Sequence, residues 1–227
     1  MKSRLSSNPT KSFNAMETYA NPQPFIPSVC APVASVATFS RFSFYTKPIE
    51  NKLPSMEFTL IDAYNYITGG VSARATARLR SLPPDQRPAF KRSNFDFCTF
   101  SGTFRKRKAE YLIQHSYFVC FDLDHLSDVE AVRLTLLNDP YFETLLLFLS
   151  PSGEGLKWVV SMERNYAFRE RFFPVETPAS YHALFFYAVQ HYLRNAYALE
   201  VDEKCKDVSR ACFLPFDPNA YLNPTLL

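Results

Sequence analysis

The sequence lacks several features that would assign it to a common class of protein. It has no apolar run near the ~18 residues that span a membrane. No apolar block follows the basic residues near Met1, so we expect no secretory signal. The five cysteines include no C-x-x-C pair, which disfavours a zinc site. Because Cys98, Cys120 and Cys212 sit in apolar runs, we expect buried free thiols in a reducing, cytoplasmic compartment.

The composition is nevertheless that of a protein with a packed core. Hydrophobic residues make up 47% of the 227 residues and aromatic residues 16%, which is more than a disordered chain carries. Residues 1–35 are rich in Ser, Pro, Asn and Ala and show no periodicity, so we expect a flexible tail there. The remaining residues, 36–227, are enough for one domain with a good core.

The net charge of +3 conceals a separation of charge along the chain. Residues 72–108 carry ten Lys and Arg against two Asp, a balance of +8, whereas residues 109–227 have a balance of −7. A basic segment beside an acidic one suggests that one part binds a polyanion and the other holds an acidic site. A solvated basic helix face is the simpler interpretation of the same pattern.

Local signals divide residues 36–115 into short elements, which we interpret as a basic α/β unit. The predicted elements are strands over 37–45 and 95–104 and helices over 59–70, 72–84 and 105–115. Thr59 is the expected N-cap of the first helix, with Asp62 three residues later. Ser101–Gly102 is expected to break the second strand.

From Tyr117 onward the pattern alternates more clearly between strands and helices. The predicted elements are strands over 117–123, 143–150 and 156–162, helices over 127–140 and 177–197, and short extended pieces over 198–202 and 210–215. The order β-α-β-β-α-β is that of ferredoxin-like and RNA-recognition-type sheets. The sequence therefore predicts an α+β fold in which residues 116–227 form this sheet.

This topology has a geometric consequence for four polar residues. Its first and third strands are central, antiparallel neighbours, which places Asp122 and Asp124 at the end of the first beside Lys157 at the start of the third. The last strand begins near the same edge, at Asp202. Residues up to 80 positions apart are thus expected to meet at one edge of the sheet.

The run YFVCFDLDHL ends an apolar strand in two aspartates at spacing i, i+2. That spacing puts both carboxylates on one face of a strand, where they repel unless a cation lies between them. Mg²⁺ or Mn²⁺ is the usual partner of such a pair, and a strand end entering solvent is the plain alternative. Phosphatases of the haloacid dehalogenase type use D-x-D-x-T, but position 126 is Leu. Sugar transferases also use D-x-D, without other support in this chain.

The turn SPSGEGLK contains two of the five glycines of the chain. Ser152 and Gly153 there are candidates to present N–H groups to a phosphate, with Lys157 adding a positive charge. An ordinary hairpin turn explains the glycines equally well. Trp158 points opposite Lys157 on its strand, so we expect it in the core.

The segment after the long helix offers further candidates. Asp202 is a possible third ion ligand, and Ser209 and Arg210 are possible phosphate ligands, or all three belong to a polar loop. Among the histidines, His125 directly follows the aspartates and is the one site candidate. We expect His182 to be partly exposed on its helix.

Five segments together resemble the VirE N-terminal-type domain of bacterial mobile elements, a family similar to the archaeo-eukaryotic primase and primase–polymerase superfamily. They are FTLIDAYNYI, TFSGTF, IQHSYFVCFDLDHL, DPYFETLLLFLSPSGEGLKWVV and LEVDEKCKDVSRACFLPFDPNAYLNP. The likeness runs from about Val36 to the end of the chain. It implies an RNA-recognition-like catalytic sheet beside an N-terminal α/β unit, with Asp122, Asp124 and Asp202 as the catalytic, metal-binding acids. Where Lys157 stands, the superfamily usually has a His that contacts the nucleotide.

The resemblance implies metal-dependent nucleotidyl transfer, of the DNA primase or polymerase type, in replication of a mobile genetic element. Mg²⁺ or Mn²⁺ would be held by the three aspartates, and the nucleotide by Ser152, Gly153, Lys157, Ser209 and Arg210. The backbone of a single-stranded DNA template would be bound by Arg74, Arg78, Lys91, Arg92, Arg105, Lys106 and Arg107. A helicase-like ATPase is expected as a partner or as a missing C-terminal domain. The alternative is a single-stranded nucleic-acid-binding module whose chemistry was lost with the His.

Overall fold

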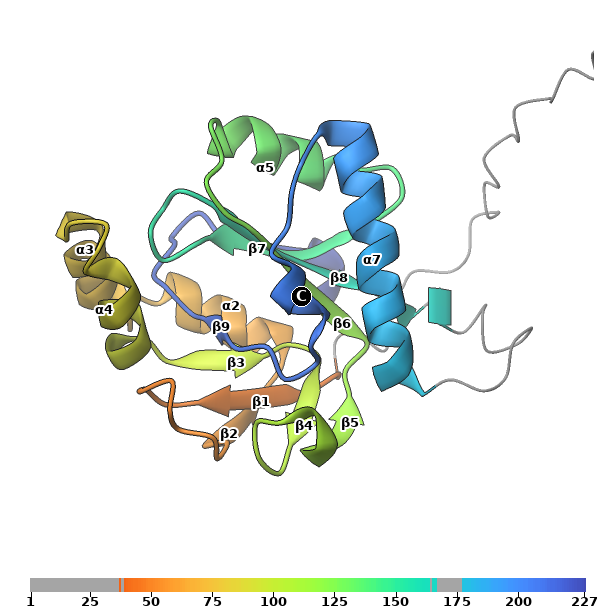
Figure 1. Ribbon diagram of the computed structural model, residues 1–227, viewed down its shortest axis with the longest axis horizontal. Coiled ribbons are helices and arrows are strands. Elements are labelled where there is room, and N and C mark those ends of the chain that lie inside the picture. Colours follow the sequence, from red (N-terminus) through yellow and green to blue (C-terminus); the bar gives the residue numbers. More distant parts are fainter. Residues whose placement is uncertain (1–36, 38, 164, 167–176) are drawn as a thin grey trace, which may run out of the picture. The chain divides into compact units, whose positions relative to one another are not determined.

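The computed structural model describes residues 37, 39–163, 165–166 and 177–227 (Figure 1). The tail predicted over 1–35 lies outside these residues. Within them the fold is α+β, with two four-stranded antiparallel sheets, a two-stranded ribbon and five α-helices. No helix of this part of the chain is long and apolar enough to cross a membrane.

The first sheet has the strand order β2-β1-β3-β9. Its strands are β1 (Phe42–Tyr45), β2 (Met56–Phe58), β3 (Phe97–Thr99) and β9 (Cys212–Phe213). β9 comes from the segment predicted to belong to the other sheet, and it pairs antiparallel with β3 so that Cys98 lies opposite Cys212. The ribbon of β4 (Gly102–Phe104) and β5 (Leu112–His115) follows β3. The C-terminal segment therefore joins the first sheet as well as the second.

The second sheet has the strand order β10-β7-β8-β6. Its strands are β6 (Phe118–Leu123), β7 (Thr144–Leu149), β8 (Leu156–Ser161) and β10 (Tyr221–Leu222). β6 and β8 are antiparallel neighbours, as predicted. The prediction that β6 is central is wrong among the described strands, because β6 is at the edge and the last strand pairs with β7.

The edge position of β6 has a local cause in the chain that follows the helix α7 (Pro178–Tyr197). That chain does return to β6, where Asp202 N–H donates to Asp122 O at 2.9 Å. It then turns at once into the 3-10 helix η2 (Glu203–Lys206), because the Asp202 side chain accepts a hydrogen bond from Lys204 N–H and caps the helix. A strand consequently does not form beside β6, although the predicted approach of residue 202 does occur.

Side-chain caps account for the starts of three helices. α2 (Leu60–Thr68) begins with a capping box in which Thr59 and Asp62 exchange hydrogen bonds, as predicted. α5 (Val129–Leu137) is capped by Asp128, and α7 (Pro178–Tyr197) by Thr177. α3 spans Ala73–Ser81, and the short 3-10 helix η3 spans Pro224–Leu226.

Two segments differ from the prediction made from sequence. The prediction of a helix over residues 105–115 is wrong. Irregular chain there leads into the short 3-10 helix η1 (Ala109–Tyr111) and then into β5. Four consecutive cations at 105–108 oppose the positive N-terminal end of a helix dipole. Conversely, α4 (Arg87–Asn94) is not predicted from sequence, and none of its residues is buried.

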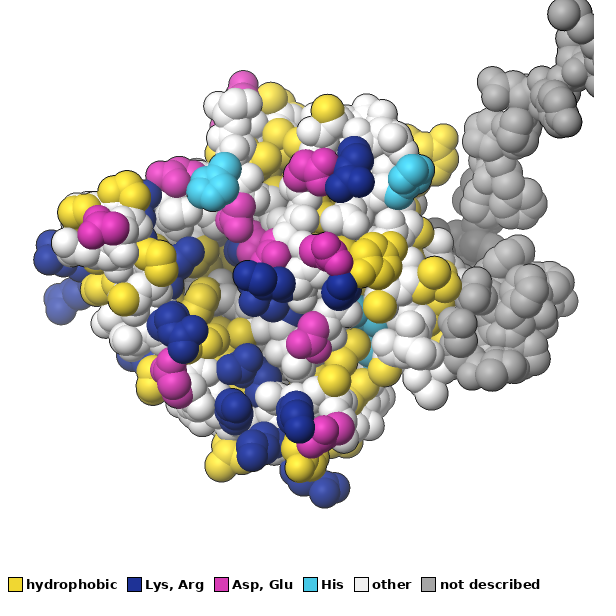
Figure 2. Space-filling model, in the orientation of Figure 1, with side chains coloured by type: hydrophobic (Ala, Val, Ile, Leu, Met, Phe, Trp, Pro, Cys, Tyr) yellow, Lys and Arg dark blue, Asp and Glu magenta, His cyan; other side chains and the backbone are white. Residues whose placement is uncertain are grey.

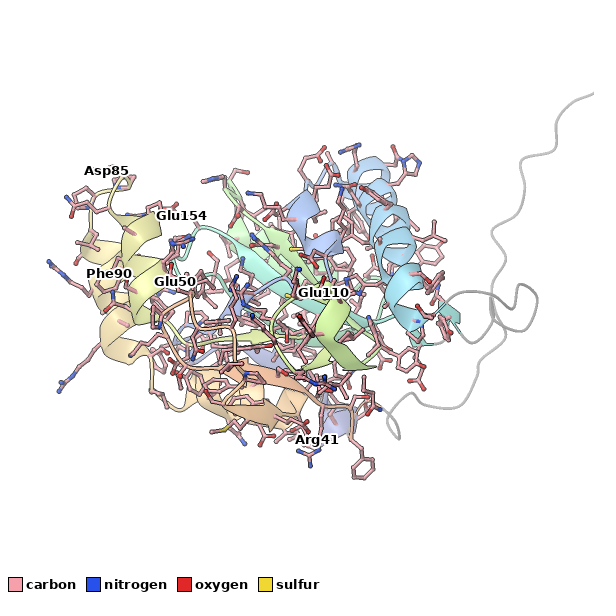
Figure 3. All side chains as sticks on the ribbon, turned by 60° about the horizontal axis from the view of Figure 1, so that its bottom comes forward. Arg41, Glu50, Asp85, Phe90, Glu110 and Glu154 are labelled. Atoms are coloured by element: carbon pink, nitrogen blue, oxygen red, sulfur yellow. The ribbon has the colours of Figure 1, made fainter. Side chains whose placement is uncertain are left out.

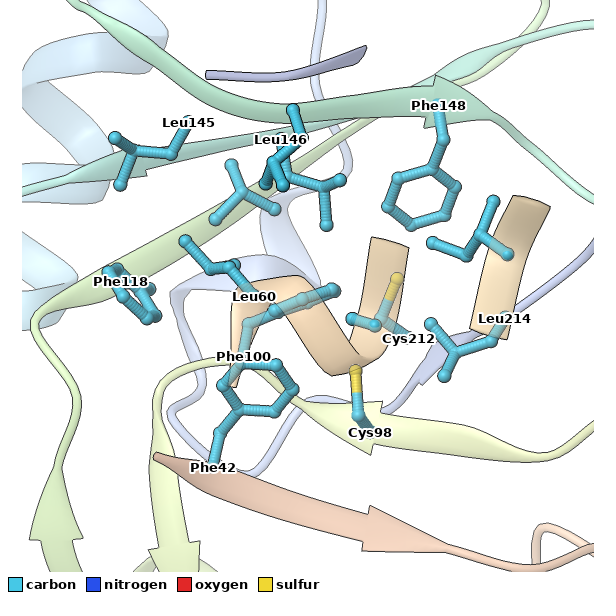
Figure 4. Close-up of a cluster of buried hydrophobic side chains, with 14 of the residues drawn as sticks. Phe42, Leu60, Cys98, Phe100, Phe118, Leu145, Leu146, Phe148, Cys212 and Leu214 are labelled. Carbon is cyan, nitrogen blue, oxygen red and sulfur yellow. The ribbon is translucent and has the colours of Figure 1, made fainter. Parts of the chain in front are cut away.

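Buried apolar clusters on the two faces of the second sheet position the polar residues of β6 and β8. The first cluster lies between the sheets, includes side chains of α2, and contacts Phe118 and Cys120 of β6 (Figure 4). The second lies under α5 and α7 and contains Trp158, which is fully buried as predicted. Because side chains alternate along a strand, Asp122 lies on the face of Cys120, and Lys157 on the face opposite Trp158. Both polar side chains therefore point into the space between the sheets.

Candidate functional site

A cavity of about 620 Å³ lies between the sheets and is lined by residues of β6, β8 and β9. This volume is within the range of about 300–1,000 Å³ that is usual for small-molecule sites. Its acidic lining residues are Glu50, Asp122, Asp124 and Asp207, and its basic ones are Lys52, Lys91, Arg92, Arg107, Lys157 and Arg210. Figure 2 shows Lys and Arg side chains gathered beside acidic ones on this face. The cavity therefore combines a group of acids with a larger set of cations.

Asp122 and Lys157 stand opposite each other in the β6–β8 register and form an ion pair. Their exposed fractions are only 9% and 8%. Lys157 contacts Asp122 Oδ2, whereas Asp122 Oδ1 is buried and has no hydrogen-bond partner in the part of the chain that the structure describes. Burial raises the pKa of Asp122, and Lys157 opposes that rise. Burial alone would lower the pKa of Lys157, but the nearby carboxylates outweigh it and raise that pKa, so the ammonium stays charged.

Asp202 and Cys205 reach Asp122 from η2. One ligand atom from each of the three residues lies within 4.8 Å of the other two, and we call these residues the acidic group. Asp202 Oδ2 also accepts a hydrogen bond from Arg210 at 2.7 Å, within an ion pair. Sequence reasoning found Asp202 through the topology. It missed Cys205, because DEKCKD has no spacing typical of metal ligands.

Asp124 lies just beyond β6 and lines the same cavity, as its spacing from Asp122 implies. It is exposed and is not one of the three residues whose ligand atoms come together. Its charge raises the pKa values of both Asp122 and Lys157. His125 is exposed and does not line the cavity, so nothing in the described structure connects it with the acidic group.

The glycines of the turn at 150–155 are required by the packing of the turn. Gly153 has a φ of 81°, which favours glycine. Its N–H donates to Ser150 O at 2.9 Å and Gly153 is not among the residues that line the cavity, so the predicted contact of this N–H with a phosphate is not formed by the described turn. A Cβ at Gly155 would lie 2.2 Å from Leu123 O, so only glycine lets the start of β8 approach the end of β6. Ser152 lines the cavity, and its hydroxyl lies 3.1 Å from that of Ser150. The turn therefore places the start of β8, and with it Lys157, against the strand that carries Asp122.

Two arginines of the basic segment hold this turn instead of facing the cavity. Arg80 Nε donates to Pro151 O at 3.2 Å, and Arg87 forms an ion pair with Glu154 at 2.7 Å. Figure 3 shows Glu154 beside the α3–α4 helices that carry these arginines. These two positive charges of the basic segment 72–108 therefore form contacts within the domain.

The predicted template-binding residues divide into two sets. Lys91, Arg92 and Arg107 line the cavity. Arg107 donates to Ile49 O at 2.7 Å, and its guanidinium lies 5.2 Å from the centre of the Phe97 ring. The lining residues do not include Arg74, Arg78, Arg105 and Lys106. Only the first set stands where it could contact a ligand that also reaches the acidic group.

Ser209 and Arg210 follow η2 and line the cavity, as their prediction as nucleotide ligands requires. The Ser209 hydroxyl donates to Asp207 Oδ1 at 3.0 Å. Arg210 pairs with Asp202, and 40% of its side chain remains exposed. Both residues therefore present polar groups at the open side of the acidic group.

A buried histidine pair fixes the position of η2. Tyr117 N–H donates to His115 Nδ1 at 2.9 Å, so His115 Nε2 carries the proton and donates to His182 Nδ1 at 3.2 Å. His182 Nε2 then donates to Cys205 O at 3.2 Å. Burial lowers the pKa of His115 to about 3 and that of His182 to about 4, which keeps both rings neutral. The prediction that His182 is partly exposed is wrong, because His115 and Cys205 satisfy both ring nitrogens inside the core.

The donor atoms around Asp122 fit a divalent cation. Asp122 Oδ1 is buried and lacks a partner, which is costly for a carboxylate oxygen unless a ligand satisfies it. The Asp202 carboxylate and the Cys205 thiol lie close enough to share one ion with it. Carboxylate and thiolate are both established ligands of divalent metals. Lys157 takes only Oδ2, so the ion pair and a cation on Oδ1 are compatible.

Comparison with known proteins places these residues in a family. The family model described as BT4734-like, N-terminal domain matches residues 90–222, more than half of the chain. The matched range includes β3 to β10 and the whole acidic group. No curated protein matches the chain, and no solved structure matches it. The chain belongs to the family of BT4734-like N-terminal domains.

Proposed function

We propose that this domain is a divalent-cation-dependent nucleotidyltransferase of the DNA primase or polymerase type, acting in replication of a mobile genetic element. The observation that carries the proposal is one cavity that is lined by Asp122 and Cys205 of the acidic group and by a set of Lys and Arg side chains, with Asp202 beside Asp122. Such acids hold divalent cations, and such cations bind triphosphate and DNA phosphates. The resemblance of the D-x-D strand and its neighbours to primase–polymerases supports the same activity and the same superfamily.

Asp122 and Asp202 are the residues that would hold the cation. A bound Mg²⁺ or Mn²⁺ would activate a 3′-hydroxyl and stabilise the pyrophosphate leaving group. The backbone hydrogen bond from Asp202 to Asp122 fixes the spacing of the two carboxylates. Asp122 is only 9% exposed, and this burial strengthens its attraction for a cation, because little water screens it. Asp124 adds negative charge at the cavity edge.

The basic side chains nearest Asp122 and Asp202 are suited to bind a triphosphate. Lys157 pairs with Asp122, and Arg210 pairs with Asp202, so both lie within reach of a phosphate bound beside these acids. Arg offers two parallel N–H donors to a phosphate, and Lys offers a compact charge. The hydroxyls of Ser152 and Ser209 line the same cavity and would accept or donate further hydrogen bonds.

The basic side chains farther from Asp122 and Asp202 are suited to bind the phosphates of a nucleic-acid backbone. Lys91 and Arg92 lie in the last turn of α4, and Arg107 lies in the segment between β4 and η1. All three line the cavity, so a single strand bound along them would lead to the acidic group. Binding through phosphates is salt-dependent and largely indifferent to sequence. We therefore propose single-stranded DNA and nucleotides as the ligands.

One observation favours the alternative of a non-catalytic binding module. Lys157 already pairs with Asp122, which lowers the negative charge available to a cation. In such a module the cations of the cavity would still bind single-stranded DNA, and the acids would serve the fold alone.

A primer-synthesis assay with labelled nucleotides and Mg²⁺ or Mn²⁺ separates the two functions. Asp122→Asn and Asp202→Asn remove a carboxylate charge with little change in shape, and both should abolish product. Asp128→Asn is the matched control, because Asp128 caps α5 away from the cavity and Asn is an equally good cap. We expect the control to retain wild-type product.

The outcomes are distinct. Product from the wild type and the control, but from neither site variant, supports the enzyme. If the wild type makes no product with either ion but binds single-stranded DNA, the binding module is correct and the proposed activity is wrong.

A further inference from the structure

Cys205 belongs to the acidic group by position, yet no acidic or metal-binding pattern in the sequence includes it. Its side chain lies with Asp122 and Asp202 such that one ligand atom of each is within 4.8 Å of the others. The residue is only 6% exposed. Burial and the charge of Asp122 raise the pKa of its thiol to about 12.

The backbone of Cys205 is fixed at both of its polar groups. Its N–H donates to Asp202 O at 3.0 Å, and its carbonyl accepts from His182 Nε2 at 3.2 Å. His182 is in turn held by His115, and both rings are buried. Supporting hydrogen bonds that orient a metal-binding residue are a regular feature of metal sites. The histidine pair thus holds Cys205 at one position beside the two carboxylates.

A second observation points to a ligand at this place. Asp122 Oδ1 is a buried carboxylate oxygen without a hydrogen-bond partner among the described residues, on a side chain that lines the cavity. The other oxygen pairs with Lys157. A cation bound to this oxygen would offset the cost of burying it without a partner. The other ligand atoms of the acidic group are a carboxylate oxygen of Asp202 and the sulfur of Cys205.

We propose that Cys205 Sγ is the third protein ligand of the cation site, so that two carboxylates and one thiolate select Mn²⁺, Co²⁺ or Zn²⁺ over Mg²⁺. This rests on the cation site of the proposed function. On binding, the Cys205 S–H bond breaks, the proton leaves to solvent, and the sulfur electron pair forms the bond to the ion, with no change of oxidation state. Thiolate disfavours Mg²⁺, which takes oxygen ligands, and favours ions later in the first transition row.

The charges around the site agree with this donor set. Without an ion, Lys157 pairs with Asp122 and Arg210 pairs with Asp202, while Asp124 adds a further negative charge nearby, so a thiolate would add to an excess of negative charge. A divalent ion supplies the positive charge that a thiolate needs.

Titration of the full chain with Co²⁺ tests the proposal, because a cobalt–thiolate bond produces a charge-transfer absorption band in the near ultraviolet. We expect the wild type to show this band and to saturate at one ion per chain. Cys205→Ser should lose the band and bind Co²⁺ at least about 10-fold more weakly, which is the lower end of the loss seen when even supporting groups of a metal site are mutated. Its affinity for Mg²⁺, measured by calorimetry, should not fall.

Cys120→Ser is the matched control, since Cys120 lines the same cavity but is not one of the three residues of the acidic group. It should keep the band and the Co²⁺ affinity of the wild type. Asp202→Asn should weaken the binding of both Co²⁺ and Mg²⁺. Thermal unfolding of each variant shows that the protein is folded in the titration.

Co²⁺ binding without the band, or a band that survives in Cys205→Ser, would overturn the assignment of Cys205. Equal losses of Co²⁺ and Mg²⁺ affinity in Cys205→Ser would overturn the claimed selectivity. These titrations contain neither nucleotide nor DNA. Their failure is therefore separate from failure of the primer-synthesis assay.

Discussion

Replacement of Lys157 tests how strongly the acidic group depends on a positive charge. Lys157→Met keeps most of the side-chain length but leaves Asp122 buried, with Oδ1 already without a partner and Oδ2 deprived of its own. Breaking a buried ion pair by removing one member costs about 3–5 kcal/mol. The exposed fractions of 8% and 9% place this pair in that range, not in the range of about 0–1 kcal/mol for surface pairs.

Urea denaturation measures this loss directly. The single tryptophan, Trp158, is fully buried next to Lys157, so its fluorescence reports unfolding of the second sheet. With an m-value of about 2 kcal/mol per M, a loss of about 4 kcal/mol lowers the urea midpoint by about 2 M. Asp122→Leu combined with Lys157→Met removes both charges and should recover most of the loss. Excess Mn²⁺ should also recover stability in Lys157→Met, because the ion replaces the missing positive charge.

The loss of folding stability in Lys157→Met should depend on pH, and the direction of that dependence follows from the pKa of Asp122. Burial raises the pKa of Asp122 above the ordinary value of 3.8, and Lys157→Met removes the charge that opposes this rise. The folded variant then binds a proton more tightly than the unfolded chain, so stability increases as the pH falls through the raised pKa toward 3.8. The penalty should therefore be largest at neutral pH. A loss below about 1 kcal/mol at pH 7, as for an exposed pair, would refute the reasoning.

Three further predictions follow from the same structure. Gly155→Ala should cost at least about 1–3 kcal/mol in urea denaturation, because its Cβ would lie 2.2 Å from Leu123 O, and an unchanged midpoint would contradict this packing. Because burial lowers the pKa of His182 to about 4 and that of His115 to about 3, wild-type stability should fall between about pH 6.5 and pH 4, and His182 should account for on the order of 3 kcal/mol of that fall, which His182→Gln should remove. Arg107→Ala should weaken single-stranded DNA binding and reduce its salt slope by about 1, whereas Arg74→Ala, outside the cavity lining, should not. Equal effects of the two arginine variants would contradict the proposed path of the DNA.

Much of the second sheet could be predicted because its strands alternate and its helices carry clear caps. The run from Phe118 to Leu123 sends alternate side chains to two apolar clusters, and this alternation alone places Asp122 on one face with Cys120. Thr59 and Thr177 mark two helix starts by their own hydrogen bonds. Signals of this kind depend only on neighbours in sequence.

The parts that sequence reasoning missed depend on partners distant in sequence. β9 and β10 have two residues each, too few to show any period, and their pairing with β3 and β7 is decided by tertiary contacts. His182 is buried because His115, 67 residues away, satisfies its ring. Cys205 lies in a polar run and joins the acidic group only because Asp202 caps η2 and turns the chain there.

The central claim is that the acidic group binds a divalent ion and that the surrounding Lys and Arg side chains bind a triphosphate beside it. The most direct test is calorimetric titration of the wild type with a non-hydrolysable nucleoside triphosphate, with and without Mn²⁺. We predict binding that requires the ion and that Asp202→Asn abolishes, while Asp128→Asn leaves it unchanged. Binding that is equally tight without the ion, or that survives in Asp202→Asn, would contradict the account.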